Sequence, residues 1–203
     1  MTSDDPLDHA VQQMLAGDEA SFRVVYRAVQ PALLRYLTVM VGAEAEDVAS
    51  EAWAQAFRDL SRFSGDADGF RGWLTTIARN RALDHLRRQS RRPVADVGLE
   101  LVEDRVEVAG AEELALGALS TDEAIALIGT LPREQAEAVV LRSVLGFDAK
   151  TAAEILGKRP GAVRTAAHRG LSALAQRLER EGRSGPSARR SDISGTSGAE
   201  GMR

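Results

Sequence analysis

Arginine side chains are concentrated in one short stretch of the sequence. Six of them fall between residues 79 and 92, where Asp84 is the sole acidic residue. Guanidinium groups hold phosphates through paired hydrogen bonds, so this cluster favours nucleic-acid contact over an ordinary solvated helix face. An aromatic ring can stack on a base, and an amide can both donate to and accept from a base edge. The candidate DNA-contacting residues here are Trp73, Asn80, Arg81, Asp84, Arg87 and Arg88.

A second candidate site follows the predicted tight turn at Gly157-Lys158-Arg159. The turn joins a predicted helix over 149–156 to a last helix that begins at Pro160 and runs to about Arg180, which is a helix-turn-helix arrangement. Apolar residues share one face of the last helix and leave polar residues on another. Arginine can pair with guanine in the major groove, and threonine can contact a thymine methyl group. The displayed residues are Arg164, Thr165, His168 and Arg169.

Helical periodicity dominates the chain and predicts an all-α fold, with no convincing alternating strand. Pro31 is expected to bend or break the second helix. The third helix, with Trp53 and Phe57 adjoining its buried side, leaves a polar stripe that would ordinarily be a solvent face. That stripe consists of Asp47, Glu51, Gln55 and Arg58. The predicted helices of the first half cover residues 7–16, 18–41, 45–60 and 70–91, and a loop at 64–69 precedes the last of them. In the second half, a helix is predicted to start at Leu131-Pro132 and to end before Gly146.

Composition and charge divide the chain into two small helical domains. Residues 1–92 and 121–182 carry the apolar periodicity, so we expect one domain in each. Residues 93–120 are acidic and free of aromatic residues, which predicts a flexible linker with some helix near its end. Residues 183–203 are rich in Gly, Ser and Arg, which predicts a disordered tail. The net charge of −4 therefore hides a segregated basic region.

Several classes of function are disfavoured. The chain has no cysteine, which excludes disulfides and thiolate metal sites. His9, His85 and His168 lack metal-ligand spacing, and no phosphate-binding glycine loop or activated serine is evident. We therefore expect no metal, no cofactor and no enzymatic activity. Neither a leader nor an apolar run of the ~20 residues that span a bilayer is present, so we expect a cytoplasmic protein without membrane insertion.

Two ordered sets of motifs resemble the extracytoplasmic-function (ECF) sigma factors of the sigma-70 family. Trp73-Leu74-Thr75-Thr76-Ile77-Ala78-Arg79-Asn80, followed by Asp84-His85-Leu86-Arg87-Arg88, resembles the σ2 domain. Ala152-Ala153-Glu154-Ile155-Leu156-Gly157, followed by Pro160-Gly161-Ala162-Val163-Arg164, resembles the σ4 domain. Two such sets in the right order are far more specific than one short motif. The segment Phe147-Asp148-Ala149-Lys150-Thr151 departs from the family's usual Tyr-x-Glu-Ile-Ala pattern, which leaves the promoter sequence open.

The resemblance implies partners and roles. Core RNA polymerase, promoter DNA and an anti-sigma factor are the partners that the family implies. The σ2 domain would bind the polymerase clamp through the polar stripe and would melt the minus-ten element, with Asn80 reading a splayed base. The σ4 domain would read the minus-thirty-five element.

Two other classes of protein stay open at this point. A conventional helix-turn-helix regulator would explain residues 131–180 but not the stretch from Trp73 to Arg92. A helical adaptor without DNA binding would show no salt-dependent affinity for duplex DNA.

Overall fold

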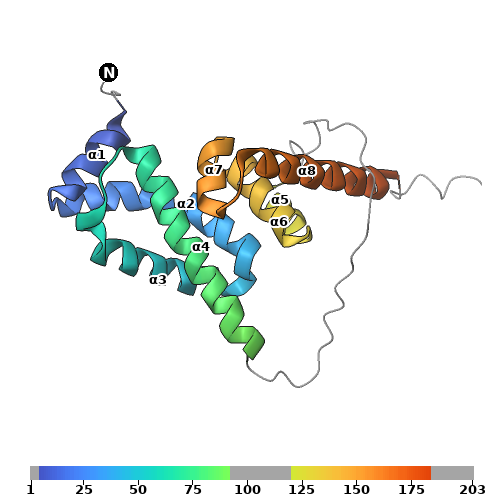
Figure 1. Ribbon diagram of the computed structural model, residues 1–203, viewed down its shortest axis with the longest axis horizontal. Helices are drawn as coiled ribbons and strands as arrows, with labels where there is room; N and C mark the ends of the chain where they lie inside the picture. Colours follow the sequence, from blue (N-terminus) through green and yellow to red (C-terminus); the bar gives the residue numbers. More distant parts are fainter. Residues whose placement is uncertain (1–4, 92–119, 184–203) are drawn as a thin grey trace, which may run out of the picture.

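The computed structural model describes residues 5–91 and 120–183, and every regular element in these ranges is helical (Figure 1). The all-α prediction is thus confirmed for the described chain. The predicted linker up to residue 119 and the predicted tail from residue 184 lie outside the described residues. None of the helices in the two described ranges combines the length and the apolar character that crossing a membrane requires.

The first half is built around α2 (Glu19–Val41), which packs against α1 (Pro6–Leu15), α3 (Ala45–Arg58) and α4 (Ala67–Arg91). Asp5 and Asp18 cap the first two helices, each through a carboxylate that accepts a hydrogen bond from a backbone N–H of the first turn. Short 3₁₀ turns, η1 (Gly42–Glu44) and η2 (Leu60–Arg62), follow α2 and α3. Figure 1 shows α4 crossing α2, and α3 packs against both helices.

Pro31 is predicted to bend or break the second helix, and the structure shows no break, because α2 runs as one helix from Glu19 to Val41. Proline removes one backbone hydrogen bond from a helix and crowds the preceding turn. On either side of Pro31, Val29 and Leu33 are buried in the core. Packing of these side chains against neighbouring helices holds the backbone helical across the proline.

The fourth helix begins earlier than the sequence predicts. The predicted loop includes residues 67–69, but α4 starts at Ala67. The Asp66 carboxylate accepts a hydrogen bond from the Gly69 N–H at 2.8 Å, and the Asp8 carboxylate accepts one from the Ala67 N–H at 2.7 Å. Asp8 belongs to α1, so the start of α4 is capped partly by a distant segment.

The second half contains α5 (Thr121–Gly129), α6 (Arg133–Val139), a π-helical turn η4 (Val140–Val144), α7 (Ala149–Leu156) and α8 (Pro160–Arg183). Helix α5 is not among the predicted helices. Its signal is present, because Ser120 and Glu123 form a capping box in which each side chain bonds the other residue's backbone N–H. The helices at 149–156 and from Pro160 are confirmed, and Gly146 ends the preceding segment with a φ of +73°.

Close contact between α6 and α8 depends on a glycine. A Cβ atom placed on Gly170 would lie 2.6 Å from Cγ2 of Val139, which is far inside van der Waals contact. Val163, Ala167 and Leu174 continue the buried face of α8 on either side of it. The apolar face that the sequence predicts for the last helix is confirmed, and the structure shows that it packs against α6.

Candidate nucleic-acid interface

The turn before α8 is fixed by local hydrogen bonds. The Asp148 carboxylate caps α7 by accepting from the Thr151 N–H at 2.7 Å, and hydrogen bonding to that backbone lowers the pKa of Asp148. Gly157 ends α7 in the left-handed conformation, with a φ of +64°. Lys158, in the turn, pairs with Glu134 of α6 at 2.5 Å. These contacts hold α7 and α8 as a helix-turn-helix pair.

The predicted reading face of α8 is exposed. Arg164, Thr165, His168 and Arg169 all lie on the solvent side of the helix. Within the described ranges, the side chains of Arg164, His168 and Arg169 make no hydrogen bond or ion pair. The Thr165 hydroxyl donates to the Gly161 carbonyl at 3.0 Å, which orients that side chain along the helix. Three cationic or ionisable groups are thus displayed on one rigid helix without an internal partner in the described chain, an arrangement that suits a polyanionic groove.

The basic stretch of α4 divides into two environments. Asn80, Asp84, Arg87 and Arg88 are exposed on the half of the helix that projects beyond the second half of the molecule (Figure 1). Arg87 pairs with Asp84 at 2.9 Å on that surface. Arg79 belongs to the same predicted cluster, but its side chain is only 15% exposed and pairs with Glu137 of α6. Side chains at residues 91 and 92 lie outside the described part of the chain.

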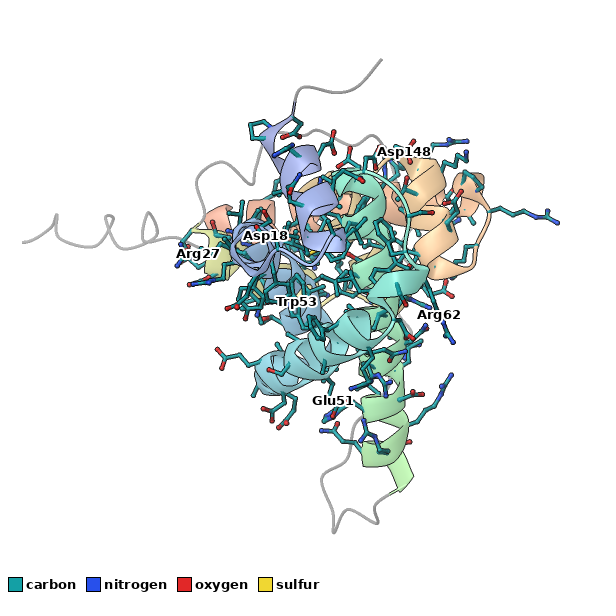
Figure 2. All side chains as sticks on the ribbon, turned by 90° about the vertical axis from the view of Figure 1, so that its left-hand side faces the viewer. Asp18, Arg27, Glu51, Trp53, Arg62 and Asp148 are labelled. Atoms are coloured by element: carbon teal, nitrogen blue, oxygen red, sulfur yellow. The ribbon has the colours of Figure 1, made fainter. Side chains whose placement is uncertain are left out.

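The polar stripe of α3 meets the basic stretch of α4. Arg81 donates two hydrogen bonds to Oε1 of Gln55, the one from Nε at 2.7 Å, and Arg88 lies 3.7 Å from a Glu51 carboxylate oxygen. Figure 2 shows Glu51 on the side of α3 that faces the far end of α4. Asp47 and Arg58, at the two ends of the stripe, are exposed. The two surfaces that the sequence predicts separately therefore form one continuous polar region.

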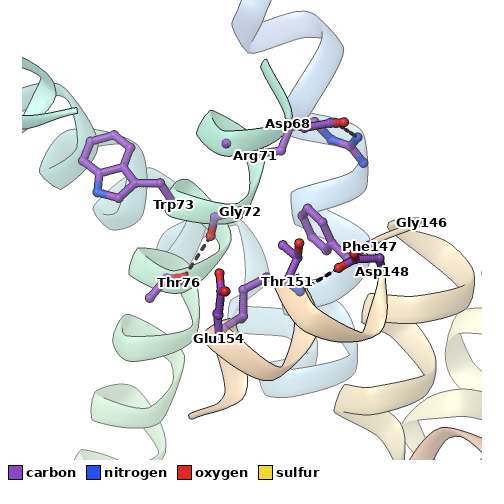
Figure 3. A pocket seen from close by; sticks show the side chains of 12 residues that line it. Asp68, Arg71, Gly72, Trp73, Thr76, Gly146, Phe147, Asp148, Thr151 and Glu154 are labelled. Carbon is purple, nitrogen blue, oxygen red and sulfur yellow. Dashed lines mark hydrogen bonds and ion pairs between the residues drawn. The ribbon is translucent and has the colours of Figure 1, made fainter. Parts of the chain in front are cut away.

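Trp73 is partly in the core, as its spacing predicts. Its ring centroid lies 5.2 Å from that of Phe63 and 5.8 Å from that of Phe70. Part of the side chain also lines an open pocket of about 570 Å³ between α4 and α7. Figure 3 shows Gly72 and Thr76 of α4 opposite Thr151 of α7 across this pocket. Trp73 thus lies apart from Arg87 and Arg88, which are more than three turns further along the helix.

An exposed aromatic group is a feature that the sequence pattern does not reveal. Helical spacing places Phe57 beside the buried side of the third helix, but this residue is 66% exposed. Its ring lies 6.1 Å from that of Phe22, which in turn lies 6.2 Å from that of Tyr26. Trp53 completes the group from the buried side. Among the described residues, Phe57 is therefore the exposed member of this aromatic group.

Taken together, the described fold defines an all-helical protein with a helix-turn-helix unit and a second basic helix. Two family models match the chain: Sigma-70 region 2 over residues 25–92, and Sigma-70 region 4 over residues 121–174. The first match covers the segment that a conventional helix-turn-helix regulator would leave unexplained. The second covers α5 to α8 as far as Leu174.

Curated relatives agree with the family models. The ECF RNA polymerase sigma factor SigD of Mycobacterium tuberculosis is 33% identical over 174 residues, covering 83% of this chain and 82% of that protein. ShbA of Streptomyces griseus is 34% identical, covering 81% of this chain and 91% of that protein. BldN of Streptomyces coelicolor is 31% identical, covering 85% of this chain and 66% of that protein. The chain belongs to the sigma-70 family, within the ECF RNA polymerase sigma factors, and has the function of a sigma factor.

Solved structures share the fold. The sigma factor RpoE, solved in complex with the anti-sigma factor NepR from Bartonella quintana, matches with a TM-score of 0.59 and 23% identity, covering 78% of this chain and 96% of that one. CnrH, solved in complex with the cytosolic domain of CnrY, matches with a TM-score of 0.59 and 19% identity, covering 87% of this chain and 99% of that one.

Proposed function

We propose that this sigma factor reads the minus-thirty-five element through the exposed face of α8. The observation that carries the proposal is that Arg164, His168 and Arg169 stand on the second helix of a helix-turn-helix pair without a partner in the described chain. Arg164 would make a bidentate contact to guanine, and Thr165 would contact a neighbouring base. Residues 121–182 would act as the σ4 domain.

Residues 1–92 would act as the σ2 domain. Asn80 is exposed on α4 and would read a splayed minus-ten base, while Arg87 and Arg88 would hold the phosphates around it. Trp73 would border the melted strand from its place beside the pocket. Arg81 and Asp84 would set the geometry of this surface through their contacts with Gln55 and Arg87.

The polar stripe Asp47, Glu51, Gln55 and Arg58 would bind the clamp of core RNA polymerase. Its contact with Arg81 and Arg88 supports the proposal, because it connects the polymerase surface directly to the minus-ten surface. The predicted linker 93–120 would follow the polymerase between the two domains. The predicted tail 183–203 would be dispensable for basal initiation.

The chemistry of RNA synthesis would belong to the polymerase, so this chain would act without enzymatic activity or cofactor of its own. It would be cytoplasmic, because its partner works on chromosomal DNA. A solved sigma factor of the same fold is bound to an anti-sigma factor, which supports regulation of this chain by such a partner.

Run-off transcription tests the proposal. Purified chain is added to core RNA polymerase on genomic fragments, and transcript starts are mapped. We expect starts at a defined promoter class that require the chain. Initiation that required a second sigma factor would contradict the proposal and would favour a conventional regulator.

A further inference from the structure

The side chain of Thr165 is oriented by its own helix. Its hydroxyl donates to the Gly161 carbonyl four residues earlier, with an oxygen–oxygen distance of 3.0 Å. Threonine is branched at Cβ, and in a helix it favours rotamers whose hydroxyl bonds a carbonyl of the preceding turn. The hydroxyl proton of Thr165 is therefore engaged by the backbone, and the Cγ2 methyl group is the branch that has no polar partner.

This methyl group belongs to the solvent side of α8. Thr165 is exposed, next to the exposed Arg164, on the second helix of the helix-turn-helix pair. Val163 and Ala167, on the other side of the helix, are buried in the core. Because packing on that side fixes the rotation of α8, the position of the Thr165 side chain on the surface is fixed as well.

The surface beneath the methyl group is small and apolar. Side chains on a helix lean toward its N-terminus, so Thr165 leans over the turn that contains Gly161 and Ala162. Both residues are exposed and neither carries a polar side-chain atom. A Cβ atom placed on Gly161 would lie in open space in the described part of the chain. On the other side of Thr165, one turn further along α8, His168 and Arg169 supply hydrogen-bond donors.

Thymine is the base that such a patch fits. In the major groove each base pair presents hydrogen-bond donors and acceptors, and thymine adds the C5 methyl group. A hydroxyl whose proton is held by the backbone has no donor left for a base edge. A methyl group over a glycine and an alanine can instead exclude water from the thymine methyl group, which is favourable because apolar surface is buried.

We propose that Thr165 is a specificity-determining residue that reads one thymine of the minus-thirty-five element through its Cγ2 methyl group and not through its hydroxyl. Gly161 and Ala162 leave the room that the thymine methyl group occupies. The inference rests on the proposed function of this face of α8, and it adds the base that is read and the atom that reads it.

Replacement of single thymines by uracil tests the proposal, because uracil lacks the C5 methyl group and keeps the hydrogen-bonding atoms of thymine. The promoter is the one found by mapping run-off transcripts, and each thymine on either strand of its minus-thirty-five element is replaced in turn. The measurement is binding of the full chain with core polymerase at fixed salt. We expect binding about fourfold weaker when uracil replaces one particular thymine, which is the contribution of one buried methyl-sized group.

Two variants separate the methyl group from the hydroxyl. Thr165→Val keeps a methyl branch and removes the hydroxyl, so it should retain the difference between thymine and uracil at that position. Thr165→Ser keeps the hydroxyl and removes the methyl group, so it should bind the two templates equally. Circular dichroism verifies that each variant is folded, which is expected because Thr165 is exposed.

The matched control is Thr38→Ser. Thr38 is exposed on α2, and its hydroxyl donates to the Leu34 carbonyl four residues earlier at 2.9 Å, as Thr165 does to Gly161. The change removes the same methyl group from the same local geometry on a different helix. It should leave the difference between thymine and uracil templates as large as in the parent chain.

The outcomes distinguish this proposal from the proposed function. Loss of the thymine–uracil difference in Thr165→Val, or its retention in Thr165→Ser, would overturn the reading by the methyl group. A parent chain that binds thymine and uracil templates equally at every position would overturn it too, while selectivity among the four natural bases would leave the proposed function intact. A parent chain without any base selectivity in this element would contradict the proposed function itself.

Discussion

Arg81 of α4 donates two hydrogen bonds to the amide oxygen of Gln55 on α3, the one from Nε at 2.7 Å. Gln55 belongs to the proposed polymerase surface and Arg81 to the proposed minus-ten surface. A direct side-chain contact therefore connects them, with Glu51 and Arg88 forming a weaker second link. Binding of polymerase to α3 would therefore affect the positions of Arg81 and Arg88, which belong to the proposed DNA-contacting surface.

Reversing charge on the stripe should weaken polymerase binding without unfolding the chain. Asp47 and Glu51 are both exposed, and substitutions at exposed positions usually change stability by no more than ~0.5 kcal/mol. We expect Asp47→Arg with Glu51→Arg to reduce affinity for core polymerase while the helical circular dichroism stays the same. Glu46→Arg, an exposed neighbour outside the stripe, is the control. Equal affinity of the double variant and the parent would remove the clamp assignment.

Arg164 and Arg177 should behave differently in DNA binding. Arg164 has no partner in the described chain, whereas Arg177 donates to the Thr130 hydroxyl of the α5 C-terminus. Arg164→Ala should cost ~1–3 kcal/mol on the preferred minus-thirty-five sequence and relax selectivity at one base pair. Arg177→Ala should not change selectivity. The measurement is holoenzyme binding to single-base variants at fixed salt, and a uniform loss for Arg164→Ala would assign it to phosphate contact.

The glycine between α6 and α8 should be intolerant of a methyl group. Gly170→Ala would force a Cβ to 2.6 Å from Val139, and overpacking of this kind typically costs ~1–3 kcal/mol of unfolding free energy. Gly161→Ala, in open space on the same helix, should be neutral or stabilising because alanine favours helix. Urea denaturation of the parent and of each variant measures the free energies of unfolding to be compared. A similar effect at the two positions would contradict the close packing.

The capping box at α5 predicts a pH dependence. Hydrogen bonds from the Ser120 hydroxyl and backbone lower the pKa of Glu123, so the ionised form is the one that stabilises the folded chain. That stabilisation is present above the pKa of the unfolded chain and is lost as pH falls through the lower, folded value. The melting temperature of Glu123→Ala should therefore be lower than that of the parent at neutral pH, and the two should be equal in strong acid. Asp122→Ala is the control, and a pH-independent difference would count against the box.

The sequence by itself determined the features that depend on neighbours a few residues apart. Apolar periodicity fixed the buried face of α8, and the turn at Gly157 with Pro160 after it fixed the helix-turn-helix, because helix faces and caps are local. The exposed group Arg164, Thr165, His168 and Arg169 followed from that local geometry. The Ser120–Glu123 box was equally local, and helix α5 could have been predicted from it.

Only the tertiary structure decided which side chains meet across distant segments. Arg79 and Glu137 are 58 residues apart, and no periodicity within α4 distinguishes Arg79 from its exposed arginine neighbours. Helical spacing places Phe57 beside the buried side of α3, but in the folded chain its side chain is 66% exposed. The continuity of α2 through Pro31 likewise depends on what packs around it. The burial of a side chain depends on neighbours that folding brings from distant parts of the chain. The periodicity of residues within one helix does not specify those neighbours.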